Sequence, residues 1–397
     1  MDAALGLLLA ALALLALAAP TTASAAPSLE IGLQDDNVFL RQYYFGREQG
    51  LQAARRLGVT RLRVNVRWAT LLEKPNARSE PATRSYDWAA FDSLIEDASR
   101  EGIKLQLALT GPAPAWATQN RRVGVRAPKA AAYGRFVRDV ARHFKGRIDR
   151  YSIWNEPNWH TQLEPAVTCR KRHWKPGCDA RLASRYRALY SAGYRAIKTT
   201  DPHAQVLFGE LSPSASGTRK QPTAFSTAPL AFLRGVTCST PTWTRARKCA
   251  PLKADGFAHH PYAFRTPPNR LVGAADDVTL ASLDRLTHAL DKLARRRALR
   301  TPTGRPMPLY LTEYGYLQPP LKGLSEPIRA RYLTQSFDRA LRHPRVRQLL
   351  QYLLVAPPPE NDTFRSQIIN ADGTHTRSFG ALERWATLHA PRLTAAP

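Results

Sequence analysis

The sequence predicts an α/β protein built as a single (β/α)8 TIM barrel, on two observations. After residue 26, short apolar segments alternate eight times with longer segments that have helical periodicity. This alternation is typical of a parallel sheet, and eight units in one run favour closure into a barrel. No linker or low-complexity segment interrupts 27–397, so one barrel domain is expected there.

The expected strands are short apolar runs bounded by turn residues. A strand cannot continue through Pro157, because proline donates no ladder hydrogen bond, so the fourth strand ends just before it. The expected strands cover 29–33, 61–68, 104–109, 151–156, 205–211, 256–262, 309–314 and 347–355.

The expected helices lie between these strands. In 88–100, apolar residues recur at i, i+3, i+4 and i+7, which is the helical period. Three of the expected helices are followed by a glycine that ends them, at Gly58, Gly102 and Gly146. The expected helices cover 46–57, 88–100, 130–144, 180–199, 229–236, 279–298, 327–341 and 379–388.

Residues 1–26 are expected to be a signal peptide. The run 7–19 contains only Ala and Leu, and Ala23-Ser24-Ala25 suits a cleavage site. The run is short for a bilayer span, so a secreted, extracellular protein without stable membrane insertion is expected. The segment contains Asp2 and no Lys or Arg, and an uncleaved anchor is the alternative.

The four cysteines favour export to an oxidising compartment. Short-range disulfides are expected between Cys169 and Cys178 and between Cys238 and Cys249. A metal site is not expected, because the spacings are not Cys-x-x-Cys and no histidine cluster accompanies them.

The formal net charge of +27 favours an anionic partner. The basic residues are spread along the chain without a nucleic-acid-binding motif, so nucleic acid is not expected. An acidic or cell-surface glycan and a merely solvated, arginine-rich surface are the two interpretations. A monomer is expected.

Two glutamates, Glu156 and Glu313, fall at strand ends that are far apart in sequence. A lone glutamate in such a position is usually a surface residue. In a barrel, however, all strands end on one face, so the two carboxylates are expected to meet. An apolar ring beside a carboxylate raises its pKa, and Trp154 precedes Glu156, which suits a general acid.

With Trp154-Asn155-Glu156-Pro157-Asn158 and Thr312-Glu313-Tyr314-Gly315, the sequence resembles the retaining glycoside hydrolases of clan A. The segment 133–158 is most similar to the branch of β-xylosidases, iduronidases and exopolysaccharide hydrolases, with the cellulase-like branch next. The resemblance implies that Glu156 is the acid/base and Glu313 the nucleophile of a glycosidase that needs no metal or organic cofactor. A retaining transglycosylase and a non-catalytic carbohydrate-binding barrel are the alternatives.

The resemblance also assigns polar residues to the substrate site. It implies that Arg63 holds the nucleophile ionised, with Arg67 as a rival on the same strand face. It implies that Asn155 binds the sugar 2-hydroxyl, which requires the strand to twist or break, because strict alternation would turn Asn155 away from Glu156. Tyr262 would hydrogen-bond the nucleophile, and Tyr262 together with Arg63 would lower its pKa.

At the end of the sixth strand, His260 would line the sugar subsite, whereas His259 is expected in the core. Three tryptophans follow strand ends and are either sugar-stacking platforms or packing residues: Trp68, Trp116 and Trp159. Glu210 ends the fifth strand and matches no role in the family, so a binding or structural role is expected.

Overall fold

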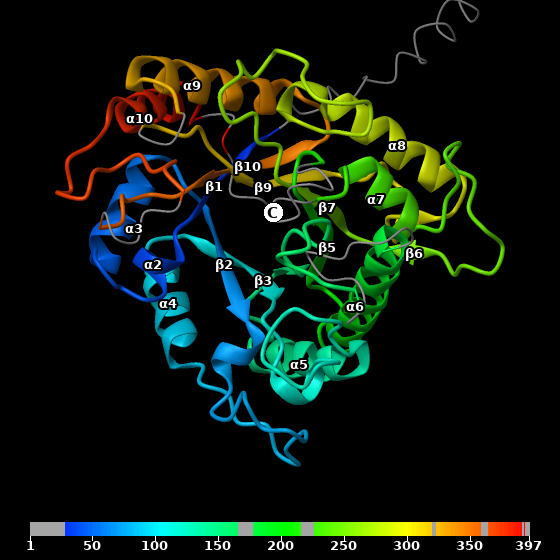
Figure 1. Cartoon of the computed structure of the whole chain (residues 1–397). Coiled ribbons are helices and arrows are strands. Elements are labelled where there is room, and N and C mark those ends of the chain that lie inside the picture. Colours follow the sequence, from blue (N-terminus) through cyan, green and yellow to red (C-terminus); the bar gives the residue numbers. More distant parts are fainter. Residues whose placement is uncertain are drawn as a thin grey trace, which may run out of the picture.

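The computed structural model describes residues 28–165, 178–215, 226–319, 323–358, 364–390 and 393. Eight strands form a closed barrel in the order β1-β10-β9-β7-β5-β4-β3-β2, and each neighbouring pair is parallel. Helices surround the strands (Figure 1). The predicted (β/α)8 barrel is therefore confirmed.

The barrel strands begin and end close to the predicted positions. They are β1 (Glu30–Gln34), β2 (Arg61–Arg67), β3 (Lys104–Thr110), β4 (Arg150–Ile153), β5 (Gln205–Leu211), β7 (Gly256–His259), β9 (Leu309–Tyr314) and β10 (Val346–Tyr352).

Three strands, β4, β7 and β10, end three residues earlier than predicted, and hydrogen bonds explain the early ends of the last two. After β7, His260 donates its backbone N–H to Leu211, and Pro261 then has no N–H to continue the ladder. After β10, the backbone N–H groups of Leu354 and Val355 both donate to the Asp35 carboxylate instead of to a strand. A separate pair of two-residue strands, β6 (Leu252–Lys253) and β8 (Leu299–Arg300), was not predicted.

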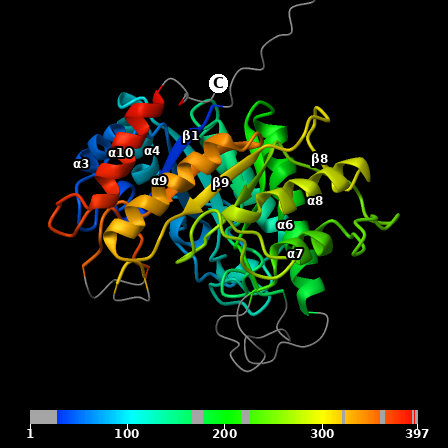
Figure 2. The same cartoon turned by 90° about the horizontal axis from the view of Figure 1, so that it is seen from above.

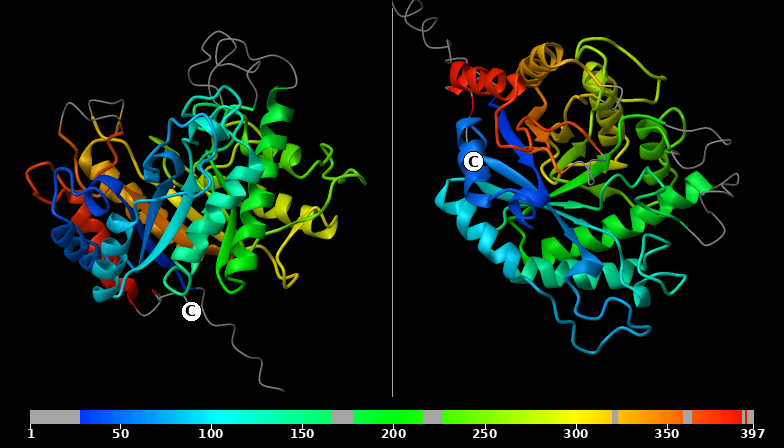
Figure 3. Two further views of the ribbon diagram at one scale, coloured as in Figure 1. Left: turned by 90° about the horizontal axis from the view of Figure 1, so that it is seen from below. Right: turned by 60° about the vertical axis from the view of Figure 1, so that its left-hand side comes forward.

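The helices match the predicted ones, with a short additional helix after β1. They are α2 (Asp36–Phe39), α3 (Arg47–Arg56), α4 (Ala89–Arg100), α5 (Ala130–His143), α6 (Cys178–Thr200), α7 (Pro229–Val236), α8 (Leu283–Arg295), α9 (Glu326–Arg342) and α10 (Arg377–His389). Residues 279–282, predicted as the start of α8, form a separate 3-10 turn with a Thr279–Ser282 capping box. The last two helices, α9 and α10, lie side by side on the outside of the barrel (Figures 2 and 3).

Buried ion pairs fill the amino-terminal end of the barrel. Glu30 accepts from Arg61 at 2.8 Å through one carboxylate oxygen and from Arg150 at 2.5 Å through the other. Arg61 also pairs with Asp149 at 2.6 Å. The Arg150 guanidinium lies over the Tyr310 ring, 4.4 Å from its centroid. Both oxygens of Glu30 are thus paired in a region closed to water.

Cys238 and Cys249 form a disulfide, as predicted. The other predicted pair includes Cys169, which lies outside the described residues, as does the expected signal peptide. Within the described ranges, no helix is long and apolar enough to cross a membrane.

Candidate active site

A cleft of about 600 Å³ opens at the carboxyl-terminal ends of the barrel strands. Both predicted catalytic glutamates lie in its wall. Other residues of the wall include Asn155, Trp159, Tyr262 and Phe264. In a (β/α)8 barrel this is the end at which active sites are built.

The end of β4 breaks the alternation of side chains. Trp154 and Glu156 have φ values of +69° and +42°, in the left-handed region that non-glycine residues rarely adopt. Because of this break, Asn155 and Glu156 both line the cleft, as the expected role of Asn155 requires. Such residues cost about 1–3 kcal/mol each. The backbone bonds from Trp154 to Leu109 and from Glu156 to Glu210, both 2.9 Å, help to hold this conformation.

Asn158 ties the loop after β4 to the loop after β5. Its Oδ1 accepts from the Ser212 backbone at 3.0 Å, and its Nδ2 donates to the Ser212 hydroxyl and to the Thr227 carbonyl, both at 2.9 Å. On the other side of the same turn, the buried Trp154 ring donates to the Gln162 carbonyl at 2.9 Å. The turn that carries Glu156 is therefore anchored on both sides.

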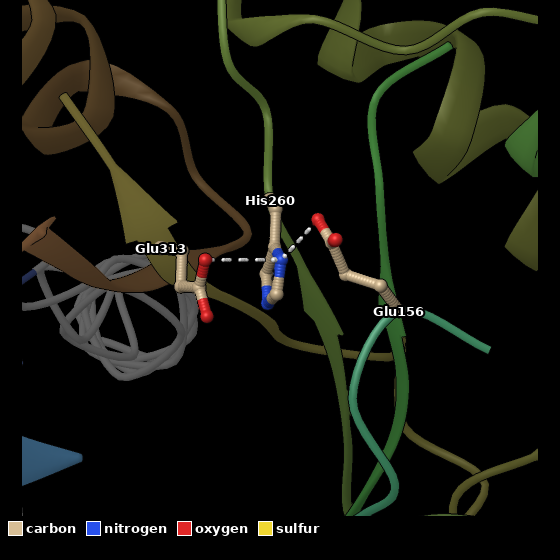
Figure 4. Close-up of side chains that lie close together, drawn as sticks. All are labelled: Glu156, His260 and Glu313. Atoms are coloured by element: carbon tan, nitrogen blue, oxygen red, sulfur yellow. Dashed lines mark hydrogen bonds and ion pairs between the residues drawn. The ribbon is translucent and has the colours of Figure 1, made fainter. Parts of the chain in front are cut away.

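The two glutamates approach each other across His260 (Figure 4). One carboxylate oxygen of Glu156 and one of Glu313 lie within 4.8 Å of each other. The Nδ1 atom of His260 is 3.0 Å from Glu156 Oε1 and 3.6 Å from Glu313 Oε2. Both glutamates are buried, with 7% and 8% of their surface exposed.

Arg63, and not Arg67, contacts Glu313. Its Nη1 donates to Glu313 at 2.8 Å, and its Nη2 donates to the Asn155 side-chain oxygen at 2.7 Å and to Glu210 at 3.0 Å. Arg67 is exposed and lines the cleft. The Tyr262 hydroxyl donates to the other oxygen of Glu313 at 3.3 Å.

The expected lowering of the Glu313 pKa is wrong. Burial raises the pKa of Glu313 above its usual value, and the charges of His260 and Arg63 act against this shift without cancelling it. Burial alone would lower the pKa of His260. The carboxylates of Glu313, Glu156 and Glu210 outweigh that effect and raise it to about 10.

The two histidines at the end of β7, His259 as its last residue and His260 directly after it, lie in different environments. His260 is fully buried and is absent from the cleft wall, which corrects the expectation that it lines the sugar subsite. It lies beneath the carboxylates and bridges two of them. Its Nδ1 faces Glu156, and its Nε2 lies 2.7 Å from Glu210 Oε2. His259 is a core residue, as predicted: its Nε2 lies 2.8 Å from the Val278 carbonyl, and burial lowers its pKa to about 4.

Two of the three candidate stacking platforms are packing residues. Trp68 is fully buried against Phe136 of α5, with ring centroids 5.2 Å apart, and Trp116 packs edge-on against Trp68 at 5.6 Å. Each ring belongs to a 3-10 turn after its strand, Trp68–Leu71 or Ala115–Ala117, which directs it away from the cleft. Trp159 does line the cleft.

Two phenylalanines of the cleft wall were not predicted. Phe264, 37% exposed, stacks on Tyr262 with ring centroids 5.3 Å apart. Phe364 lies edge-on to Tyr262 and to Tyr352, at 5.6 and 5.4 Å. Both follow the strand ends in loops, where no periodicity indicates the direction of a side chain.

Glu156, His260 and Glu313 offer ligand atoms close enough together for a metal ion. The charges around them favour a different interpretation. Arg63 already supplies a positive charge 2.8 Å from Glu313, and the raised pKa of His260 favours a proton rather than a metal on its ring. We therefore interpret the cluster as an acid–base site.

No family model and no curated protein sequence matches this chain. Several solved structures share its fold. One is a family 39 glycoside hydrolase from Bacteroides cellulosilyticus WH2 (TM-score 0.60, 16% identity), covering 91% of this chain and 64% of that one. The match to a GH39 β-xylosidase from Caulobacter crescentus has a TM-score of 0.55 and 17% identity, and covers 91% of this chain and 71% of that one. The match to native xylanase 10B from Thermotoga maritima has a TM-score of 0.54 and 13% identity, and covers 92% of this chain and 96% of that one.

This chain thus spans less than two thirds of the Bacteroides enzyme. At these identities the similarity establishes the barrel fold. The function has to be argued from the site itself.

Proposed function

We propose that the protein is a retaining glycoside hydrolase that cleaves O-glycosidic bonds of a poly- or oligosaccharide by double displacement. The observation that carries this proposal is the separation of at most 4.8 Å between carboxylate oxygens of Glu156 and Glu313. Retaining enzymes hold their carboxyl groups about 5–5.5 Å apart, whereas inverting enzymes need about 6.5–9.5 Å to fit a water molecule.

In the first step, Glu156 donates its proton to the glycosidic oxygen while a carboxylate oxygen of Glu313 bonds to the anomeric carbon. The Asn155 side-chain oxygen accepts from Arg63, so its amide N–H₂ is the end left to donate to the sugar 2-hydroxyl. That hydrogen bond strengthens in the transition state.

In the second step, Glu156 removes a proton from water as the water oxygen bonds to the anomeric carbon and displaces Glu313. The sugar leaves with retained configuration. Arg63 and the Tyr262 hydroxyl stabilise the Glu313 carboxylate when it is released as an anion.

We propose an acidic or cell-surface glycan as the substrate class. Arg67 lines the cleft and is exposed, and its side chain makes no hydrogen bond or ion pair with any described residue, so its guanidinium is available to a carboxylate or sulfate. The net charge of +27 adds long-range attraction for a polyanion. Trp159 and Phe264 offer ring faces to pyranose units.

A secreted monomer fits this substrate class, with residues 1–26 acting as the signal peptide. A retaining transglycosylase would use the same first step, with a sugar in place of water as the acceptor. Product analysis at high substrate concentration separates the two reactions, because only the transglycosylase makes products longer than the substrate.

The test incubates the mature protein and its Glu313→Ala variant with neutral and acidic polysaccharides, and identifies the products by mass. Glu96→Gln, an exposed change on α4, is the matched control. New oligosaccharides from the parent and from Glu96→Gln, but not from Glu313→Ala, are expected, with acidic glycans preferred.

Equal cleavage by the parent and Glu313→Ala would rule out Glu313 as the nucleophile. Binding without cleavage by the parent would favour a non-catalytic carbohydrate-binding barrel.

A further inference from the structure

Glu210 is a third carboxylate of the site, and an irregularity in β5 sets its direction. Gly209 and Glu210 have φ values of +117° and +51°, and the pairing of β5 with β7 shifts register between Gly209 and Leu211. A Cβ on Gly209 would lie only 2.4 Å from the Ala258 carbonyl oxygen, so glycine is required there. The bulge leaves Glu210 fully buried and outside the cleft wall, where it cannot touch a substrate.

One carboxylate oxygen of Glu210 accepts three hydrogen bonds. Its Oε2 accepts from His260 Nε2 at 2.7 Å, from Thr312 Oγ1 at 2.8 Å and from Arg63 Nη2 at 3.0 Å. Arg63 also contacts Glu313, and His260 also contacts Glu156 at 3.0 Å and Glu313 at 3.6 Å. Glu210 therefore reaches both glutamates through one intervening side chain.

These contacts decide where hydrogen sits on the imidazole. Burial would raise the pKa of Glu210, but the charge of Arg63 and the hydrogen bond from His260 lower it to about 2. An ionised carboxylate can only accept, so Nε2 of His260 must carry a hydrogen. The other ring nitrogen, Nδ1, then faces Glu156 at 3.0 Å and Glu313 at 3.6 Å.

We propose that Glu210 is a positioning residue that keeps a hydrogen on Nε2 of His260 and thereby keeps the mobile proton of the site between Nδ1 and Glu156. This inference rests on the proposed glycosidase function. In the first step that proton passes from Glu156 to the glycosidic oxygen as its bond to carbon breaks and Glu313 bonds to the anomeric carbon. In the second step water returns a proton to Glu156. The Nε2–H bond to Glu210 persists through both steps.

Glu210 also sets the charge balance around the imidazole. The titratable and charged groups of this network come from β2, β5 and β9, from the turn after β4 and from the segment of His260 itself: Arg63, Glu156, Glu210, Glu313, His259 and Tyr262. Removing the negative charge of Glu210 while leaving Arg63 in place takes away an interaction that raises the pKa of His260, and so eases loss of the proton that Nδ1 shares with its neighbour. The proton would then leave at a lower pH.

The direct test is ¹⁵N NMR of the histidine ring nitrogens in the full mature chain, with the His260 signals assigned from a His260→Asn sample. The expected result is a hydrogen on Nε2 in the parent at every pH at which the protein is active. In Glu210→Gln that hydrogen moves to Nδ1 or exchanges between the nitrogens. A parent protein with an unprotonated Nε2 would overturn the proposal, whether or not the variant folds.

The kinetic test compares Glu210→Gln with Thr312→Val, which removes a hydrogen bond to the same oxygen but no charge. For Glu210→Gln, we expect the alkaline limb of the kcat profile to move down by about one pH unit or more. Thr312→Val should keep the parent limb, and Glu210→Asp should restore it in part. Equal activity losses in both variants with an unmoved limb would mean a purely structural role.

The NMR result does not depend on turnover, so the two proposals can fail separately. A hydrogen on Nε2 in a protein that cleaves no glycan would leave the positioning role intact and remove the glycosidase. Glycan cleavage with an unprotonated Nε2 would support the glycosidase and rule out the positioning role.

Discussion

The barrel contains two ion networks with buried members, one at each end, and they differ in how their cationic groups are matched to their carboxylates. At the amino-terminal end, Arg61 and Arg150 face two carboxylates, Glu30 and Asp149. At the carboxyl-terminal end, an arginine and a histidine face three glutamates. The two networks share a strand, since Arg61 and Arg63 lie two residues apart on β2 and are both fully buried.

A structural ion cluster and a reactive one differ in whether a proton is free to move between their groups. In the amino-terminal network each carboxylate pairs with a guanidinium that is always charged, Lys104 adds a further positive charge beside Asp149, and the centre is closed, so no proton has to move. In the other network a third carboxylate keeps one proton shared, and the cleft gives that proton access to a substrate.

Glu156→Ala is expected to slow cleavage of a glycoside with a poor leaving group by up to about 10⁴-fold, because no group remains to protonate the departing oxygen. The formation of the glycosyl-enzyme from an activated aryl glycoside should change little. Added azide should restore turnover and give a glycosyl azide of retained configuration. The measurement is steady-state and burst kinetics on both substrates, and equal losses on the two would contradict the acid role.

Glu30→Gln is expected to lower the free energy of unfolding by about 3–5 kcal/mol, because the buried Arg150 loses the carboxylate it pairs with and the buried Arg61 loses one of its two. The activity per folded molecule should not change. Urea denaturation measures the loss. Asp149→Asn is the control, and its effect should be much smaller, since that side chain is 44% exposed. An unchanged midpoint for Glu30→Gln would show that this network does not stabilise the barrel.

The acidic limb of the kcat/KM profile is expected above pH 4.5, because Glu313 attacks only when ionised and its pKa is raised from 4.5 by burial. Activity is therefore lost as the pH falls through that raised value. Arg63→Gln removes an opposing positive charge and should move the limb up by at least about one pH unit. Arg61→Gln, measured on its folded fraction, should leave the limb in place; a matching shift would show that the two networks are coupled.

Trp159→Ala is expected to raise KM about tenfold, which corresponds to about 1.4 kcal/mol of lost binding, while leaving stability nearly unchanged. Trp116→Phe should instead lower the stability and leave KM unchanged, because the Trp116 ring packs on Trp68 and does not reach the cleft. Paired KM and thermal unfolding measurements decide between these outcomes. A raised KM for Trp116→Phe would reinstate that residue as a sugar platform.

The fold and the meeting of Glu156 with Glu313 were predictable, because parallel strands in a barrel all end on one face. The directions of other side chains were not. The rings of Trp68 and Trp116 are set by 3-10 turns that follow the strands, and Glu210 faces inward only because of the bulge at Gly209. Sequence periodicity carries no signal for such one-residue irregularities.

Burial was the second quantity that the sequence could not supply. A strand position indicates that Arg63 can reach Glu313, but the sign of the Glu313 pKa shift depends on how much solvent the whole site excludes. The same is true of His260, whose full burial placed it beneath the carboxylates and not in the cleft wall.

Three side chains determine where protons lie in the site: Arg63, Glu210 and His260. Each belongs to a strand or directly follows one, and each is buried beneath the cleft. The aromatic rings of the cleft wall, such as Phe264 and Phe364, come from loops. The buried charge network and the rings of the cleft wall thus belong to different structural elements, the strand ends and the loops. Loops grafted from another barrel should change which glycan is accepted while the pH profile is inherited unchanged, which makes this chain a scaffold for selecting new specificities.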